Sequence, residues 1–176
     1  QTPRTDLIPE IAPILGDSIE IIQMGGLDGL TKEEIQTMTP APGDHVLVSR
    51  LKDGSSVSFG ESHILPRLET CMDQLKKDQV SLILFLCTGE FPDTFQADVP
   101  LIFPSKILTS IVSAIHPHHL TVMTPAKEQL PQMQTKWAGC ADPVAVMGPC
   151  SCVDHDAVVM LGIGLVDLVH HFSLVV

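Results

Sequence analysis

The feature that most constrains this chain is an apolar run that stops abruptly at small polar residues. The run Val80–Leu86 reads VSLILFL, and Cys87-Thr88-Gly89-Glu90 follows it directly. A short run that is apolar on both faces is typical of a central strand of a parallel sheet, because helices cover such a sheet on both sides. Ligands of open α/β sheets bind at the carboxyl ends of the strands. We therefore expect a binding site at Cys87.

Cys87 is the first catalytic candidate because of this position. Backbone N–H groups at a strand end favour a thiolate, which is the form of cysteine that acts as nucleophile or base. The alternative interpretation is a small buried hydrophobic residue that ends a strand, as free cysteines often are. The motif alone leaves both interpretations open.

Helical and strand patterns alternate along the rest of the chain, which predicts an α/β architecture with parallel sheets. Lys52-Asp53-Gly54-Ser55 lies between two alternating runs and predicts a β-hairpin beside the sheet. Thr31–Glu34 predicts a capping box, and Thr5 or Asp6 is expected to cap the first helix. Apolar spacing predicts helices over 7–15, 61–79, 106–116 and 127–137, and strands over 19–23, 45–51, 56–59, 80–86, 120–124, 144–147 and 157–161.

The chain is expected to form two similar lobes. The strand predicted over 120–124 is followed by Pro125-Ala126 and a helix, which repeats the pattern of the opening segment Gln1–Leu15. We therefore predict a first α/β lobe over 1–116 and a second over 117–176, with a cleft between them. The first residues read as a loop after a strand, and the last ones stop within an apolar run, so we also expect chain segments beyond both ends.

Composition excludes several classes of function. The 176 residues include 21 acidic and 10 basic ones, a net charge of −11, which argues against a nucleic-acid-binding surface and against attraction to anionic membranes. An anionic ligand must therefore be held by a few local donors. No dinucleotide fingerprint, P-loop or G-x-S-x-G motif occurs in the sequence.

The five cysteines form no regularly spaced framework, which favours reduced thiols and a cytoplasmic location. No apolar stretch is both long and unbroken enough to span a bilayer, and there is no signal peptide. The cluster Cys140, Cys150, Cys152 and His155 matches no familiar zinc spacing, so we expect no metal.

The opening segment supplies a candidate anion site. A strand followed by Thr2-Pro3-Arg4 and a helix would place Thr2 and Arg4 at the same sheet edge as Cys87. Arg4 is suited to hold a carboxylate or phosphate with a bidentate guanidinium. The alternative is a surface arginine that pairs with Asp6 or Glu10.

Six blocks of the sequence, in order, resemble a known family. QTPRTDLIPEI, GLDGLTKEEI, LVSRLKDGSSV, LILFLCTGEF, FPSKILTSIV and TPAKEQLPQMQTKW are similar to successive blocks of the AroM family, from Gln1 to about Trp137. That family, whose biochemical role is undefined, is placed near the aspartate/glutamate racemase superfamily. The resemblance implies two similar α/β lobes with a cleft between them. One cysteine from each lobe would act on opposite faces of an amino acid in the cleft, and this proton transfer would need no cofactor.

The resemblance assigns roles to individual residues. Cys87 corresponds to the cysteine of the first lobe, and Thr88 would lie in the loop that binds a substrate carboxylate. The second cysteine is expected at the end of the strand 158–161, where this chain has Leu161-Gly162. Either a short stretch with that cysteine is absent from the chain, or the protein has one such cysteine, which would argue against a two-base mechanism.

These observations lead to three hypotheses. The first is a cofactor-independent enzyme of the racemase-like, isomerase-like or lyase-like type, in which Cys87 acts on a small carboxylate or amino acid. Its expected anion-binding residues are Thr2, Arg4, Arg50, Thr88, Gly89, Thr124 and Pro125. The second is a non-catalytic small-carboxylate-binding regulatory protein linked to aromatic amino-acid metabolism. The third is a structural partner in a homo-oligomer.

Overall fold

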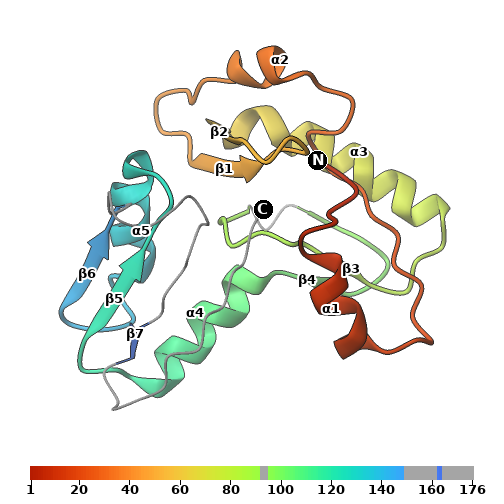
Figure 1. The fold of residues 1–176 in the computed structure, drawn as a ribbon. Coiled ribbons are helices and arrows are strands. Elements are labelled where there is room, and N and C mark those ends of the chain that lie inside the picture. Colours follow the sequence, from red (N-terminus) through yellow and green to blue (C-terminus); the bar gives the residue numbers. More distant parts are fainter. Residues whose placement is uncertain (92–94, 149–161, 164–176) are drawn as a thin grey trace.

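A computed structural model describes residues 1–91, 95–148 and 162–163, which form a mixed α/β structure with three small sheets (Figure 1). None of the helices within these ranges is long and apolar enough to cross a membrane. The elements in chain order are α1 (Ile8–Leu15), α2 (Lys32–Gln36), β1 (Val46–Arg50), β2 (Ser56–Gly60), α3 (Glu61–Lys77), β3 (Ile83–Leu84), β4 (Leu101–Ile102), α4 (Pro104–Ile115), β5 (Leu120–Met123), the 3₁₀ helix η1 (Lys127–Gln129), α5 (Leu130–Trp137), β6 (Val144–Met147) and β7 (Gly162–Ile163).

The predicted hairpin is confirmed. β1 and β2 pair antiparallel, and Gly54 in the connecting turn adopts φ +80°, a left-handed conformation that suits glycine. Alternate residues of the two strands, including Leu47 and Phe59, are buried. They pack with Ile35 of α2 and Ile64 of α3, so the hairpin and α3 form one hydrophobic core.

The predicted central strand over 80–86 is much shorter in the structure. Only Ile83–Leu84 form β3, which pairs parallel with β4. Leu82 is 46% exposed and Leu84 is 38% exposed, so the prediction of a strand covered on both faces is wrong for one face. The other face packs on Met72 of α3, because Ile83 and Phe85 point into that cluster.

An aromatic cluster fixes the segment that leads from β3 to Cys87. The ring of Phe85 stacks on Phe103 with centroids 4.6 Å apart and on Phe95 with centroids 5.5 Å apart. Phe91 tilts against the same ring at 5.6 Å. The backbone on both sides of Cys87 is therefore anchored by aromatic side chains, the buried Phe85 before it and the partly buried Phe91 after it.

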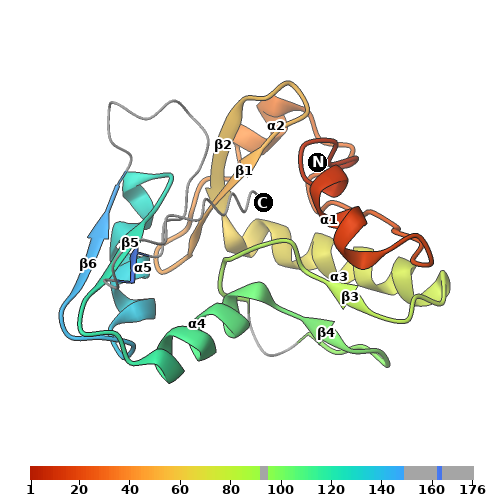
Figure 2. The ribbon, with the colours of Figure 1, turned by 60° about the horizontal axis from the view of Figure 1, so that its bottom comes forward.

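The second half of the described chain contains a three-stranded sheet. β5 pairs parallel with β6 as expected, but β7 pairs antiparallel with β5, so the prediction of parallel sheets throughout is wrong here. A second core gathers Val112 of α4, Leu120 and Val122 of β5, and Trp137 of α5. Figure 2 shows α4 leading from the β3–β4 pair toward this sheet. The predicted strand over 157–161 lies outside the described residues.

The opening segment differs from prediction in two respects. Residues 19–23 form no strand, and the N-cap of α1 is Leu7 rather than Thr5 or Asp6. The carboxylate of Asp6 is bound to Arg4 at 2.8 Å, and it makes no side-chain cap bond to the helix. The capping box of Thr31 and Glu34 on α2 is confirmed.

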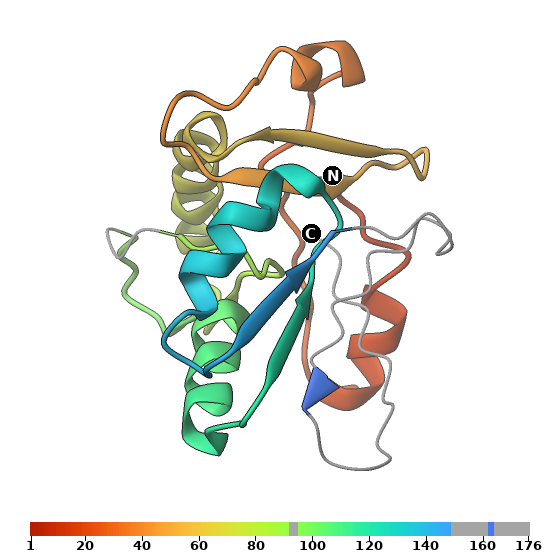
Figure 3. The same ribbon diagram turned by 90° about the vertical axis from the view of Figure 1, so that its left-hand side faces the viewer.

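Two glutamines join the hairpin to α5. The side-chain amide of Gln132 accepts from the Val46 N–H at 2.8 Å and donates to the Val46 carbonyl at 2.9 Å, as a neighbouring strand would. Gln129 donates to the same carbonyl at 3.0 Å. Figure 3 shows α5 beginning at the hairpin. The edge of β1 is thus held by side chains from the far half of the described chain.

Replacing Gln132 with leucine tests the hydrogen bonds between α5 and β1. The Gln132→Leu variant leaves the part-buried Val46 N–H without its acceptor, so we expect the free energy of unfolding to fall by about 1–3 kcal/mol in urea titrations. Gln36→Leu, at an exposed site on α2, is the matched control and should change stability little. Equal effects of the two substitutions would contradict the role of Gln132.

Candidate functional site

Cys87 lies three residues beyond β3, and the residue is 6% exposed. The backbone N–H of Gly89 donates a hydrogen bond to its sulfur at 3.2 Å. A Cβ atom at position 89 would lie 3.1 Å from that sulfur and 3.0 Å from a methyl group of Leu47. The turn therefore wraps closely around the thiol, and glycine is the residue that permits this approach.

The thiol of Cys87 is protonated at neutral pH. Burial raises its pKa to about 11, and the nearby Glu61 carboxylate also raises it. The N–H of Gly89 and the charge of Lys136 act in the opposite direction but are outweighed. The backbone N–H expected from the sequence is present, yet the resting side chain is a thiol, which donates a proton rather than accepting one.

Lys136 of α5 places an ammonium group beside the same loop. Its Nζ donates to the Thr88 carbonyl at 2.7 Å and to the Ser105 hydroxyl at 2.7 Å. Ser105 is buried at the second position of α4, after Pro104, and the N–H groups of Lys106 and Ile107 donate to the Phe103 carbonyl. The ammonium also lies 5.6 Å from the centroid of the Trp137 ring, and within the described ranges no carboxylate forms an ion pair with it.

The surroundings of Lys136 shift the pKa of its ammonium group in both directions. Burial lowers its pKa, while the neighbouring Glu90 carboxylate and the Cys87 thiol site raise it. A half-buried ammonium without a carboxylate partner is less favourable than a paired one, and an anionic ligand would supply the partner.

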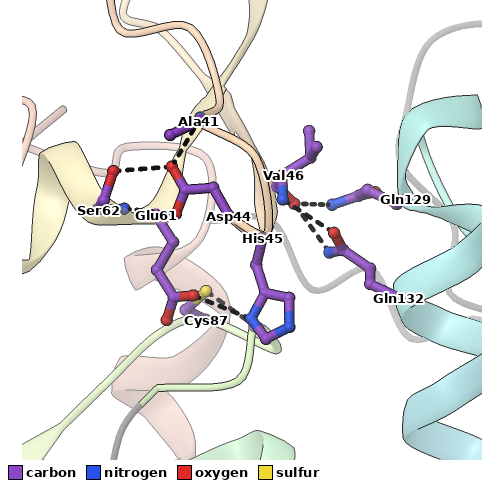
Figure 4. A network of polar contacts seen from close by, with 10 residues as sticks. Ala41, Asp44, His45, Val46, Glu61, Ser62, Cys87, Gln129 and Gln132 are labelled. Carbon is purple, nitrogen blue, oxygen red and sulfur yellow. Dashed lines mark hydrogen bonds and ion pairs between the residues drawn. The ribbon is translucent and has the colours of Figure 1, made fainter.

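Glu61 and His45 form a pair on the other side of Cys87. Glu61 is the first residue of α3, is 8% exposed, and accepts from the His45 ring, whose Nδ1 lies 2.9 Å from Oε2. Burial raises the pKa of Glu61, and the nearby carboxylates of Asp44 and Glu90 raise it further. Figure 4 shows the Glu61 carboxylate and the Cys87 sulfur on the same side of the His45 ring. We call Cys87, Thr88, Gly89, Ser105, Lys136, Glu61 and His45 the Cys87 cluster.

Several residues predicted to bind the anion have partners of their own in the opening segment. The N–H of Thr2 donates to the Asp28 carboxylate at 2.6 Å. The guanidinium of Arg4 binds both carboxylate oxygens of Asp6, which is the alternative considered for this residue. These hydrogen bonds lower the pKa of Asp6 to about 2, and the charge of Arg50, the last residue of β1, also lowers it.

The other predicted residues divide between two places. Thr88 and Gly89 belong to the Cys87 cluster, Thr88 through its carbonyl and Gly89 through its N–H. Thr124 is buried and donates to Gln129 at 2.5 Å, while Pro125 is exposed. Thr124 thus supports the glutamine that holds the hairpin edge. In the cysteine-rich group considered for a metal, Cys150, Cys152 and His155 lie outside the described residues.

Four members of the cluster were not predicted from the sequence: His45, Glu61, Ser105 and Lys136. Lys136 carries a weak signal, because it lies four residues after Gln132 and hence on the same face of α5. A polar side chain at each of these positions predicts that this face contacts another part of the protein. Nothing in the sequence indicates that the contact is the loop after β3.

A family model described as "AroM protein" matches residues 1–167, which is most of the chain. The chain belongs to the AroM family. This confirms the resemblance found in the sequence blocks. Neither the curated proteins nor the solved structures contain a match.

The raised pKa of Cys87 predicts a pH-dependent stability. Below the unfolded thiol's pKa of 9.0 both states are protonated, and the stabilisation is fully present. Between pH 9 and 11 the unfolded state loses the proton first, so stability falls as pH rises. We expect wild type to lose about 3 kcal/mol more than Cys87→Ala across this range in urea titrations.

The matched control for this titration is Cys71→Ala, which keeps the Cys87 thiol and should retain most of the fall. Cys71 is only half-buried on α3. If wild type and Cys87→Ala lost stability in parallel from pH 9 to 11, the sulfur would not be the buried acid described above.

Proposed function

We propose that this AroM-family protein binds a small carboxylate beside Cys87 and acts on it without a cofactor, as a racemase-like enzyme does. The observation that carries the proposal is the ammonium of Lys136, bound to the Thr88 carbonyl and the Ser105 hydroxyl and without a carboxylate partner in the described part of the chain. A carboxylate is the simplest ligand that supplies both the missing charge and an acceptor.

Two groups favour an anion at this place. Lys136 supplies a positive charge, and the Ser105 hydroxyl, which accepts from Lys136, keeps its own hydrogen to donate. The net charge of −11 disfavours anions over most of the surface, so a local cation determines where one binds.

In this proposal the site lies between two α/β lobes, 1–116 and 117–176. Cys87, Ser105 and the His45–Glu61 pair come from the first range, and Lys136 comes from the second. Contacts from α5 to both β1 and the loop after β3 support this arrangement. The three cysteines that the structure describes are free thiols, which fits the proposed cytoplasmic location.

Cys87 is proposed to act as a proton donor. Its thiol is protonated at neutral pH because burial raises the pKa to about 11. A carboxylate bound to Lys136 would reduce the positive charge felt by the sulfur and keep it protonated until it reacts. Transfer of its proton to a carbon next to the carboxylate leaves a thiolate that Lys136 stabilises.

A second candidate function, the non-catalytic carboxylate-binding regulator, is favoured by one observation. The sulfur of Cys87 is nearly inaccessible, with 6% of the residue exposed, and a structural cysteine shows the same burial. In that case Lys136 and Ser105 bind the ligand and the thiol takes no part. The two candidates share a binding site and differ in whether the ligand is converted.

Thermal unfolding with a panel of amino acids, keto acids and aromatic-pathway acids tests the binding site. A ligand at about a hundred times its Kd stabilises the folded state by about 2.7 kcal/mol, so at least one carboxylate should raise Tm by several degrees. Lys136→Gln should abolish the rise. Lys77→Gln, at the exposed end of α3, is the matched control and should retain it. A rise that persists in Lys136→Gln would refute the assigned site.

Replacing the sulfur separates the two candidates. Hydrogen–deuterium exchange at the α carbon of the bound carboxylate, followed by NMR in D₂O, should be lost in Cys87→Ser while the Tm rise persists. Serine keeps the shape but is a far weaker acid than a thiol. Binding without exchange in wild type would favour the regulator, and unchanged exchange in Cys87→Ser would remove Cys87 from the mechanism.

A further inference from the structure

One face of α4 is apolar and exposed. Ile107, Ile111 and Ile115 follow one another at four-residue spacing, so they form a single row along the helix. Their exposed fractions are 48%, 51% and 46%. We call these three residues the α4 row. Single exposed isoleucines are common on protein surfaces, but three in one row form a continuous apolar strip, which is typical of a surface that binds another protein.

The α4 row is not the face with which the helix packs on its own chain. That other face carries Ser105 and Val112, which are 5% and 2% exposed. Val112 belongs to the core around β5, and Ser105 accepts from Lys136. Figure 2 shows α4 at the outside of the fold, between the β3–β4 pair and the three-stranded sheet. The helix is thus apolar on two adjacent faces, and the described residues cover one of them.

We propose that the α4 row is the interface through which two copies of this chain form a dimer. In an antiparallel arrangement about a twofold axis beside Ile111, Ile107 of each copy lies next to Ile115 of the other. The equal spacing on the two sides of Ile111 makes the row its own complement, as a twofold interface requires. Rows of residues four apart interdigitate when two helices cross at about −50°. The interface is separate from the carboxylate site, because Ser105 lies on the buried face of the helix.

Charge identifies a second copy as the occupant. The chain carries a net charge of −11, so most of its surface repels another copy. The sequence of α4 contains no acidic residue, and Lys106 is its one charged residue. Two acidic copies can therefore approach each other along this helix with little repulsion. A strongly basic partner would be attracted to the acidic parts of the surface instead, since the row offers it no counter-charge.

The size of the row determines the strength of the dimer. A stable complex buries about 800 Å² on each partner, and three half-exposed isoleucines provide much less. We therefore expect a weak dimer in equilibrium with the monomer, with a Kd of roughly 10–100 µM. Salt screens the repulsion between two copies, so the dimer should become stronger as ionic strength rises, whereas an interface formed by ion pairs would become weaker.

Sedimentation equilibrium of the wild-type chain tests the dimer. The average mass should rise from that of the monomer toward twice that value between about 5 and 500 µM protein, and it should rise further at high salt. Ile111→Glu should keep the protein monomeric over this range, because two carboxylates would face each other across the axis. Ile111→Ser, a milder change, should raise the Kd by about tenfold or more.

Ile14→Glu is the matched control. Ile14 on α1 is 83% exposed, so this variant replaces an exposed isoleucine and adds the same charge at a site outside the row. It should dimerise as the wild type does. Urea titration of dilute protein should give Ile111→Glu and the wild type nearly the same free energy of unfolding, since the substitution lies on the surface of the monomer.

Three results would overturn the proposal. The first is a wild-type chain that stays monomeric at the highest concentration, and the second is a dimer that persists in Ile111→Glu. The third is a monomeric wild type whose free energy of unfolding falls in Ile111→Glu, because another part of the same chain would then cover the row. None of these results depends on whether a carboxylate binds beside Cys87.

Discussion

The placement of the Lys136 ammonium is the interaction on which the candidate site depends. Its two hydrogen bonds join α5 to the loop after β3 and to the start of α4, three segments far apart in sequence. Burial of a cation costs free energy that neutral hydroxyl and carbonyl oxygens recover only in part. Because Glu90 is near but forms no ion pair with it, the site keeps an electrostatic preference for an added anion.

α5 is the element that makes this placement precise. Gln129 and Gln132 bind the backbone of Val46, and Lys136 follows Gln132 by one helical turn on the same face. The helix ends in Trp137, which is buried in one core with Leu120 and Val122 of β5 and whose ring centroid lies 5.6 Å from the Lys136 ammonium. Displacing α5 would therefore disturb the hairpin edge and the ammonium together, so packing of the helix and geometry of the site are linked.

Local sequence patterns predicted most of the helices and strands but not the contacts between them. Asp53-Gly54 predicted the hairpin, because a turn needs few residues and its conformational demands are local. The run Val80–Leu86 predicted a strand longer than β3, because apolar composition cannot report that one face stays uncovered. Cys87 was identified from its position after that run. Lys136 and His45 were not, since their significance arises from contacts with residues 16 to 48 positions away, which no local periodicity encodes.

The pKa of Cys87 determines which mechanism the site can support. A thiol with a pKa of about 11 is a weak acid, and because it is protonated at neutral pH it cannot act as a base there. A reaction in which Cys87 is the single acid–base group therefore lacks a base for proton abstraction. Movement of a proton at a carbon next to a carboxylate therefore requires a second acid–base group, one that lacks its proton at neutral pH, in addition to Cys87.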